Sequence, residues 1–386
     1  MSNLDIKMAE LNKQFKAQII NVGTNVIEVA KIPFSSPTTN YMTYGGIPVG
    51  KITEFYGGEG GGKTTSALDI VKNAQIKFKK VYTDKVTSIE DEIEQLSEQD
   101  TKQAKNAISK LQSQLNEIQE QGPKVVVYVD TEQTLDTEWA QLLGVQTEEM
   151  ILVRPEAQTA EQVFQIIIEL VSTGNVGLVV LDSIPMLVSQ NIFDESMEKK
   201  SYGGISQPLT VFCSKITPLL TKYQCAFIGI NQVRENLASM YSTESTPGGR
   251  GWKHACTLRL KFKKGSFIDN NNNELTKSAE NPAGNKVQIE IIKSKCCKSD
   301  RRLGYYTLNY TEGIDILADS ITMALQYGIV AKAGAWYRIM TEEGEIKIDN
   351  EGTQLSFQGM AKFLNYLVAH EDEVQDLLDR LDKVMM

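Results

Sequence analysis

The sequence has no long apolar run and no secretory leader pattern among its 386 residues. No stretch approaches the roughly 20 apolar residues that a helix needs to cross a bilayer. Residues 1–10 lack the basic and apolar regions of a signal peptide. These absences argue against an integral membrane protein, and we expect a soluble, cytoplasmic protein with no membrane among its partners.

Cysteine is scarce, and the few residues form no disulfide framework. The five cysteines have neither a repeated spacing nor a C-x2-C pair, and they are Cys213, Cys225, Cys256, Cys296 and Cys297. The adjacent Cys296 and Cys297 cannot bridge each other without strain. We therefore expect reduced, structural thiols, as in a cytosolic protein.

Positive charge is also in deficit, because the formal net charge is −9. Taken alone, this balance argues against nucleic acid as a partner. Residues 250–264 nevertheless carry six cations and no acid, and residues 293–302 add five more against Asp300 alone. Screening limits the reach of distant charge to about 8–10 Å, so this basic strip could bind a phosphate backbone. An ordinary solvated charged face remains the alternative.

What the sequence does contain is a regular alternation of apolar runs and helical segments. The expected strands are 51–56, 125–130, 150–153, 178–182 and 226–231, and the expected helices are 64–79, 136–143, 159–172 and 209–223. Unbroken Val/Ile/Leu strands between helices indicate a parallel sheet covered on both faces. The predicted class is α/β, with a mostly parallel twisted sheet flanked by helices. Later β-runs at 257–264, 286–292 and 303–310 predict antiparallel strand additions.

About forty residues separate the helix at 64–79 from the next strand, where a few would suffice. Ile89, Ile93 and Leu96 fall at helical spacing, residues 97–100 offer a turn, and apolar residues repeat the spacing from Ile108 to Ile118. We predict an inserted antiparallel helical hairpin at 84–122. Both interpretations stay open, an arm that touches a partner or a neighbouring subunit and a solvent-exposed decoration.

A complete Walker A loop follows the strand at 52–56 and opens a helix. Its glycines let backbone N–H groups surround phosphate oxygens, Lys63 supplies charge to the β- and γ-phosphates, and the Thr64 hydroxyl can ligate Mg²⁺. ATP and Mg²⁺ are therefore the expected ligands. The loop comprises Gly57, Gly58, Glu59, Gly60, Gly61, Gly62, Lys63, Thr64 and Thr65.

Three later strand ends supply polar groups for hydrolysis. Asp182 ends a Walker B strand and should hold Mg²⁺. Glu132 is the best-placed general base, but Asp130 competes and strand alternation cannot choose between them. The third strand end supplies Asn231 and Gln232, and an amide there could sense the γ-phosphate and report it to the polar segment 233–249.

Several blocks together resemble RecA-type recombinases, including phage-encoded members of the UvsX type. They occur in the family's order over residues 42–340, and they are Gly45-Gly46-Ile47-Pro48-Val49-Gly50, Val129-Asp130-Thr131-Glu132-Gln133-Thr134-Leu135-Asp136, Val179-Val180-Leu181-Asp182-Ser183, Ile230-Asn231-Gln232-Val233-Arg234 and Ala333-Gly334-Ala335-Trp336-Tyr337. The resemblance implies a bacterial or phage-infected host cell. It leaves open whether the chain comes from the host or the phage.

The resemblance implies a role for each matching residue. Glu132 becomes the general base, Gln232 the γ-phosphate sensor and Trp139 the adenine-stacking residue, with Asp136 nearby. The first DNA-binding loop corresponds to 194–204 and the second to 233–250. Lys293 and Lys295 match a lysine pair that reaches the ATP of a neighbouring subunit in a helical filament. The DNA-binding candidates are Lys199, Lys200, Tyr202, Gly203, Val233, Arg234, Gly248, Gly249 and Arg250.

The resemblance also implies the domain organisation. Residues 1–40 are expected to be an oligomerisation arm and linker, 41–312 a RecA-like ATPase core, and 313–386 a small C-terminal domain with an acidic tail. The implied function is homologous recombination and DNA repair: a DNA-dependent ATPase forms a filament on single-stranded DNA and exchanges strands with double-stranded DNA. Mediator and single-strand-binding proteins would be further partners. A RecA-core helicase motor or accessory loader, and a nucleotide-gated scaffold without activity, are the alternatives.

The sequence departs from the family at three places. The Walker A loop is richer in glycine, which costs backbone order without removing a phosphate-binding N–H. The first DNA loop is more cationic than usual, and the hairpin at 84–122 is foreign to the standard fold. These departures bear on nucleation, partner choice and filament geometry rather than on ATP binding.

Overall fold

The computed structural model describes residues 3–14, 29–99, 101–194, 204–235, 244–270, 272–276, 278–298, 300–349 and 351–385. It divides into two compact units, residues 1–30 and residues 31–386. The first unit contains helix α1 (Asn3–Gln14), on which Leu4 and Ile6 are exposed and Lys7 contacts Glu10 at 3.0 Å. All further elements belong to the second unit.

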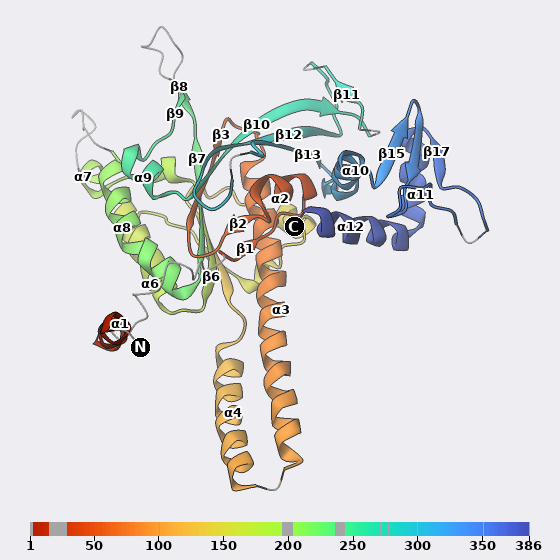
Figure 1. Ribbon diagram of the computed structural model, residues 1–386. Coiled ribbons are helices and arrows are strands. Elements are labelled where there is room, and N and C mark those ends of the chain that lie inside the picture. Colours follow the sequence, from red (N-terminus) through yellow and green to blue (C-terminus); the bar gives the residue numbers. More distant parts are fainter. Residues whose placement is uncertain are drawn as a thin grey trace. The chain divides into compact units, whose positions relative to one another are not determined.

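The second unit is built on a large sheet, which has ten strands among the described residues (Figure 1). Its order is β14 (Gly313–Ile314), β13 (Leu303–Asn309), β12 (Gly284–Ser294), β10 (Leu258–Ile268), β3 (Ile52–Gly57), β7 (Ala226–Gln232), β6 (Val176–Asp182), β4 (Val125–Asp130) and β5 (Met150–Val153), with β11 (Glu274–Leu275) paired to β10. Strands β10 to β5 run parallel, and β12, β13 and β14 are antiparallel to their neighbours. The predicted α/β class with antiparallel additions is confirmed.

Helices cover both faces of the parallel strands. Tyr128 and Val180 point into a core shared with α3 (Lys63–Ser97) and α5 (Thr137–Leu142). Val127 and Val179, one residue earlier on the same strands, point into a second core under α6 (Ala160–Ser172), α8 (Ser206–Tyr223) and α9 (Gly249–Ala255). Because both faces are buried, these strands read as unbroken apolar runs instead of alternating ones.

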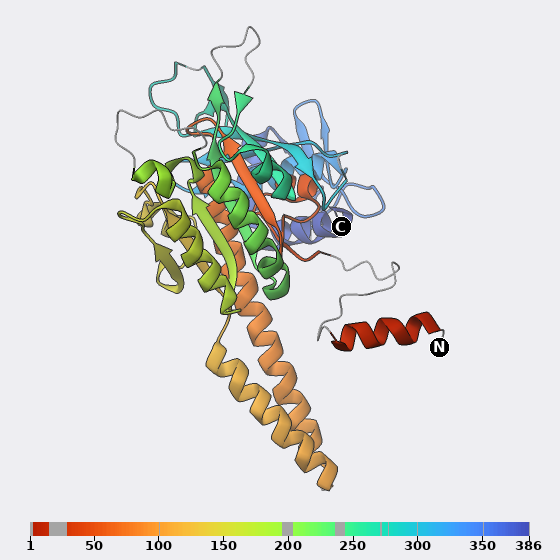
Figure 2. The ribbon, with the colours of Figure 1, turned by 90° about the vertical axis from the view of Figure 1, so that its left-hand side faces the viewer.

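The insertion is a helical hairpin, with its turn where it was predicted. Helix α3 ends at Ser97 and α4 spans Lys102–Gln121, and both extend away from the sheet in Figures 1 and 2. Half-buried or buried side chains alternate at spacings of three and four, which is typical of a coiled-coil seam; they are Tyr82, Val86, Ile89, Ile93 and Leu96 on α3 and Ala104, Ile108, Leu111, Leu115 and Ile118 on α4. The expected break near residue 80 is wrong, because 63–97 contains no Gly or Pro and the Walker A helix itself continues as the first arm.

Residues 31–43 are structured, although we expected a linker up to residue 40. Strand β1 (Lys31–Ile32) pairs with β2 (Ile47–Pro48), and Ile32 and Phe34 are buried in the first core. Helix α2 (Pro37–Thr43) follows, with Ser36 as its N-cap. Pro37 therefore starts a helix at a position that needs no backbone N–H, instead of marking a linker.

Residues after 315 form helices and a small sheet with a hydrophobic core of their own. The elements are α10 (Ile316–Gln326), β15 (Val330–Ala333), β16 (Trp336–Ile339), β17 (Ser356–Gln358), α11 (Met360–Ala369) and α12 (Glu371–Met385). The three strands were not predicted from the sequence, and α11 and α12 meet at His370. The proposed boundaries at 40/41 and 312/313 stay predictions.

Short elements complete the description. They are the 3-10 turns η1 (Thr147–Glu149) and η2 (Ile184–Met186), helix α7 (Gln190–Phe193), and the paired strands β8 (Arg234–Glu235) and β9 (Glu244–Ser245). All five cysteines are free thiols. Every helix in the described part of the chain is too short or too polar to span a bilayer.

Candidate functional site

The Walker A loop joins β3 to α3 at the carboxyl edge of the sheet. Gly62, the N-cap of α3, has a φ of +87°, and a Cβ there would lie 2.9 Å from the Tyr306 hydroxyl oxygen. A Cβ on Gly57 would overlap the carbonyl oxygen of Phe262 on the neighbouring strand β10. Glycine is therefore required at the two ends of the loop, while Gly58 between them has open space around it.

Lys63, the first residue of α3, folds back onto its own loop. Its Nζ donates to the carbonyl oxygens of Gly57 at 3.2 Å and Gly58 at 2.6 Å. Burial lowers the pKa of Lys63, while the carboxylates of Asp182 and Glu132 act in the opposite direction. The ammonium group thus lies inside the loop, where a phosphate could replace the backbone carbonyls as its partner.

Thr64 and Asp182 come together as the sequence predicts. Thr64 Oγ1 donates to Asp182 Oδ2 at 2.9 Å, and the Tyr128 hydroxyl donates to the same oxygen at 2.8 Å. Burial raises the pKa of Asp182, and the two hydroxyl donors oppose this shift. A hydroxyl oxygen beside a carboxylate suits Mg²⁺, which favours oxygen ligands and takes others from water and substrate phosphates. No group of three or more His, Cys, Asp or Glu side chains that could hold a metal occurs within the described ranges.

Glu132 and Asp130 have different surroundings, which the sequence could not reveal. Asp130 accepts from the backbone N–H groups of Thr134 at 3.2 Å and Leu135 at 3.1 Å, and its Oδ2 lies 3.4 Å from Arg154 Nε. It therefore shapes the loop after β4. The strand ends at Asp130, so alternation no longer applies at Glu132.

Glu132 lies against the ends of two other strands. Its Oε1 accepts from Ser183 Oγ, next to Asp182, and from Gln232 Nε2 at 3.4 Å. Asp130 is in register with Asp182, and Gly57 with Gln232, so the parallel strands place these groups at one edge. The carboxylate of Glu132 and the amide of Gln232 thus form one cluster beside the Walker A loop. Ser183 is a contact that the sequence analysis missed.

A cavity of about 340 Å³ lies against the Walker A loop. It is within the size range of small-molecule sites. Trp139 lines it, and Asp136, the N-cap of α5, accepts from the Trp139 backbone N–H at 3.0 Å. Asp136 therefore starts the helix that presents Trp139. Four further lining residues had no motif by which the sequence could identify them: Lys264, Asn285, Leu308 and Tyr310.

The two predicted DNA-binding loops are described to different extents. Lys199, Lys200, Tyr202 and Gly203 of the first loop lie outside the described residues. Strands β8 and β9 pair at the two ends of the second loop, with Arg234 opposite Ser245. The loop then leads through Gly248 into α9, where Arg250 is exposed.

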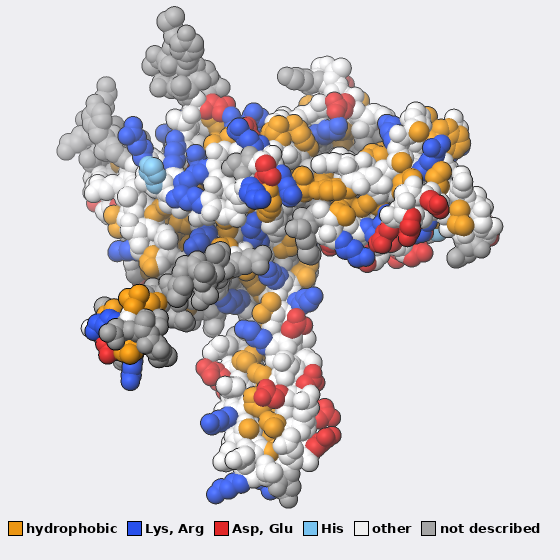
Figure 3. Space-filling model, in the orientation of Figure 1, with side chains coloured by type: hydrophobic (Ala, Val, Ile, Leu, Met, Phe, Trp, Pro, Cys, Tyr) orange, Lys and Arg blue, Asp and Glu red, His pale blue; other side chains and the backbone are white. Residues whose placement is uncertain are grey.

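Several cations of the basic strip at 250–264 are paired with carboxylates within the protein, and its role in DNA binding stays a prediction. Trp252 is fully buried. Arg259 pairs with buried Glu54, Lys261 pairs with Glu244, and Lys263 lies 3.8 Å from Glu290. From Leu258 onward the strip follows β10, so apolar residues that face the interior alternate with the outward-facing Arg259, Lys261 and Lys263. Figure 3 nevertheless shows Lys and Arg side chains gathered over the part of the core that carries α9, and acidic ones along α12.

Lys293 and Lys295 close the C-terminal end of α9. Lys293 Nζ donates to the carbonyl oxygens of Lys253 at 2.5 Å and His254 at 3.1 Å, and Lys295 Nζ donates to that of His254 at 3.2 Å. Burial lowers the pKa of Lys293, as does the charge of Lys295. Within one protomer these lysines therefore complement the negative end of the helix.

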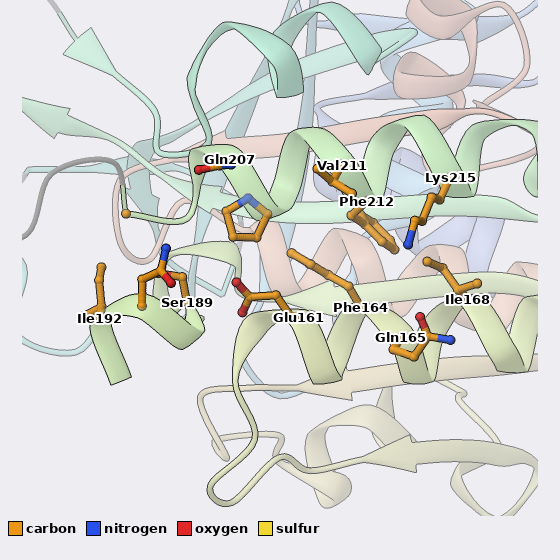
Figure 4. A pocket seen from close by; sticks show the side chains of 13 residues that line it. Glu161, Phe164, Gln165, Ile168, Ser189, Ile192, Gln207, Val211, Phe212 and Lys215 are labelled. Carbon is orange, nitrogen blue, oxygen red and sulfur yellow. The ribbon is translucent and has the colours of Figure 1, made fainter. Parts of the chain in front are cut away.

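A second cavity, of about 350 Å³, lies between α6 and α8 on the opposite face of the sheet from α3 (Figure 4). Apolar side chains from both helices line it, including Phe164, Ile168 and Val211. Glu161 lies at one end, where it accepts from the Gln190 backbone N–H at 2.9 Å. Among the described residues, the Walker A loop, Asp182 and Glu132 do not line this cavity, so the cluster at the Walker A loop is the candidate nucleotide site.

Comparisons with known proteins agree with this geometry. Residues 2–94 and 101–315 match the model of the RecA N-terminal domain. The chain is 27% identical over 392 residues to Protein RecA of Thermus aquaticus, with 100% of the chain and 96% of the relative covered. It is 28% identical over 348 residues to Protein RecA of Chlorobaculum parvum (89% and 84% covered) and 27% identical over 382 residues to that of Limosilactobacillus reuteri (98% and 87% covered).

Proposed function

Because this chain belongs to the RecA family, we propose that it is an ATP-dependent recombinase that forms a helical filament on single-stranded DNA. It binds nucleotide and is a DNA-dependent ATPase. In the filament it promotes homologous pairing and strand exchange with double-stranded DNA. The observation that carries the proposal is the contact of Glu132 with Gln232 beside the Walker A loop, because it unites a carboxylate and an amide at the phosphate site.

ATP is the proposed substrate, and each residue at the site has its own part. The N–H groups of 57–65 and the Lys63 ammonium bind the phosphates, and Glu132 orients and deprotonates the attacking water. Gln232 senses the γ-phosphate. Thr64 and Asp182 would hold Mg²⁺, which supplies charge neutralisation at the phosphates. Trp139 stacks on adenine, and Asp136 positions it.

DNA binding is assigned to the two loops that the resemblance indicates. Lys199, Lys200, Tyr202 and Gly203 supply the first loop. The second contributes the residues where it leaves β7 and where it enters α9, namely Val233, Arg234, Gly248, Gly249 and Arg250. Cationic side chains bind the backbone of DNA without regard to sequence, as strand exchange on any DNA requires.

Filament assembly is assigned to the arm 1–40 and to the lysine pair. Lys293 and Lys295 would reach the ATP that is held by the core (41–312) of the neighbouring subunit, which makes ATP an assembly ligand. Replacing both lysines by alanine should leave the protomer folded, as judged by circular dichroism, but suppress DNA-stimulated turnover. Unchanged stimulation would count against the shared site. The hairpin (84–122), the C-terminal domain (313–386), and mediator or single-strand-binding proteins would modulate this assembly in the bacterial cytoplasm.

The decisive experiment measures ATP hydrolysis with and without single-stranded DNA and images the ATP complex by electron microscopy. We expect DNA-stimulated turnover and helical filaments. Rings, or turnover that does not depend on DNA, would contradict the recombinase and favour a RecA-core helicase motor. Absence of any turnover would favour a nucleotide-gated scaffold.

A further inference from the structure

Glu54 is a fully buried carboxylate that lies outside the nucleotide cavity. It is on β3, and its exposed fraction is 0%. Three side chains from three other elements donate to it: Asn231 Nδ2 at 2.8 Å, Trp252 Nε1 at 2.8 Å and Arg259 Nε. Burying a carboxylate is costly unless donors of this kind replace water. With these three donors, the Glu54 carboxylate is a fixed point, that is, one buried group that links β3 to β7, α9 and β10.

The amide of Asn231 connects this fixed point to Gln232. Its Nδ2 donates both to Glu54 Oε1 at 2.8 Å and to the Pro247 carbonyl oxygen at 2.9 Å. Its Oδ1 accepts from the Gln232 backbone N–H at 3.0 Å. Since two of the partners are acceptors and the third is a donor, the amide has only one satisfied orientation. One side chain therefore holds the γ-phosphate sensor, Glu54 and the far end of the second loop together.

Arg259 and Trp252 attach the same far end to Glu54 by a second route. While Arg259 Nε pairs with Glu54 Oε2, its Nη2 lies 3.4 Å from Thr246 Oγ1, next to Pro247. Trp252, which follows the loop on α9, packs on Gly229 of β7, where a Cβ would lie 2.7 Å from the indole ring. Both ends of segment 233–247 are thus tied to one buried carboxylate.

We propose that Glu54 is a positioning residue that couples the nucleotide sensor Gln232 to the second DNA-binding loop. This inference rests on the proposed function. When the Gln232 side chain changes partner on binding nucleotide, the Asn231 amide is the contact that passes the change to Pro247. Glu54 and Arg259 keep the Asn231 amide and the far end of the loop attached to the sheet. A change at the Gln232 end of the loop therefore alters its far end. Binding of DNA to the loop acts back on Gln232 by the same contacts, because coupling between two sites is reciprocal.

The test is Glu54→Gln, which alters the contact of this side chain with Arg259. The glutamine Oε1 can still accept from Asn231 and Trp252, but its NH₂ group faces the Arg259 guanidinium, which also donates. We expect nucleotide affinity and DNA-free turnover to stay within about twofold of wild type. The ratio of turnover with and without single-stranded DNA should fall by a factor in the range of about 5 to 150 that is typical of coupled sites. The increase in DNA affinity caused by a non-hydrolysable ATP analogue should fall by a similar factor.

Glu290→Gln is the matched control. Glu290 lies in the same sheet, with its carboxylate oxygens 3.8 Å from Lys263 and 3.4 Å from Arg302, and among the described residues its side chain pairs with these two cations and not with the loop. It should keep the wild-type ratio. A folded Glu54→Gln protein with wild-type DNA stimulation would overturn the proposal, and so would an equal loss of DNA-free and DNA-stimulated turnover, which indicates a merely structural role.

Two further outcomes are decisive. If Glu54→Gln does not fold, Trp252→Phe removes the indole N–H donor and keeps a smaller aromatic ring, and an unchanged ratio in that variant overturns the proposal. If wild-type turnover does not respond to DNA, the proposed function itself fails and the coupling falls with it. Loss of the response in the variant alone supports the coupling.

Discussion

Lys63 and Glu132 act on different parts of the same ligand, because one lies inside the Walker A loop and the other contacts Gln232 outside it. Lys63→Ala removes the side-chain cation that donates to the carbonyl oxygens of the loop, so it should abolish nucleotide binding. Glu132→Gln keeps the Oε1 acceptor for Ser183 and Gln232 but removes the base. It should retain nucleotide and lose turnover by about 10²–10⁴-fold. Fluorescent-nucleotide binding and phosphate release measure the two effects, and an equal loss of affinity in both variants would contradict this division.

The glycines of the loop are not equivalent, which gives a matched pair of variants. Gly62→Ala places a Cβ at a φ of +87° and within 2.9 Å of the Tyr306 hydroxyl, so it should destabilise the fold by more than about 1–2 kcal/mol. Gly58→Ala meets no atom within 4 Å and should be tolerated. Thermal unfolding of both variants measures the difference, and equal melting temperatures would contradict it.

At this scale the sequence predicts residues that a motif defines and misses those that only packing defines. Lys63, Thr64 and Asp182 occupy the places that the motif spacing indicates. Glu54 and Tyr310 carry no motif, since their importance comes from segments more than a hundred residues away in the sequence. Trp252 is a similar case, because an aromatic residue in a basic stretch is equally compatible with base stacking and with the core, and only the packing shows that it is buried.

Among the elements, the helical hairpin is the most self-contained. Its coiled-coil seam lies between its own two helices, and none of its residues beyond 84 belongs to the two cores of the sheet. Val81, Asp84 and Ile118 line one hollow at its base, so the two helices are adjacent there and a short Gly-Ser linker can replace residues 84–122.

We expect that deletion to leave nucleotide affinity unchanged and the core folded, because the residues removed belong to neither core of the sheet. Loss of the folded core would contradict this expectation. Filament length by electron microscopy then separates the two roles of the hairpin. Unchanged ATPase and assembly would make it a decoration, whereas shorter filaments with a normal core would make it a contact arm.

Element prediction succeeded where the local pattern decides structure. The heptad-like spacing of Ile108 and Leu111 made the hairpin visible, and the Val/Ile/Leu runs made the parallel strands visible. The continuity of α3 was not predicted, because no local sequence signal distinguishes two helices separated by a break from one long exposed helix. The strands of the C-terminal part were missed because they are three or four residues long.

At the scale of the whole second unit, α2 joins the sheet region to the C-terminal part. Asp319 on α10 accepts from Ser36 Oγ at 2.5 Å, from the Thr38 backbone N–H at 3.1 Å and from Thr38 Oγ1. The paired residues are 281 to 283 positions apart in the sequence, so no local sequence pattern could predict these contacts. They make the attachment of the C-terminal part sensitive to the protonation of one carboxyl group.

Burial raises the pKa of Asp319 to about 6 from its ordinary 3.8, although its three hydrogen bonds oppose the shift. The folded protein therefore binds this proton more tightly than the unfolded chain does. The contribution of Asp319 to stability is present below pH 4 and is lost as the pH rises towards 6. Two pKa units correspond to about 3 kcal/mol, an upper value for this one group.

Asp319→Asn does not titrate, so the free energy of unfolding of wild type relative to this variant should decrease between pH 4 and pH 6.5 and then stay level. Urea unfolding at a series of pH values measures this difference. Asp372→Asn, an exposed carboxyl on α12, is the control and should leave the wild-type pH dependence unchanged. If wild type and Asp319→Asn have the same pH dependence, the carboxyl is not a proton-binding link between α2 and α10. A decrease confined to wild type would show that the attachment of the C-terminal part weakens as this buried carboxyl ionises.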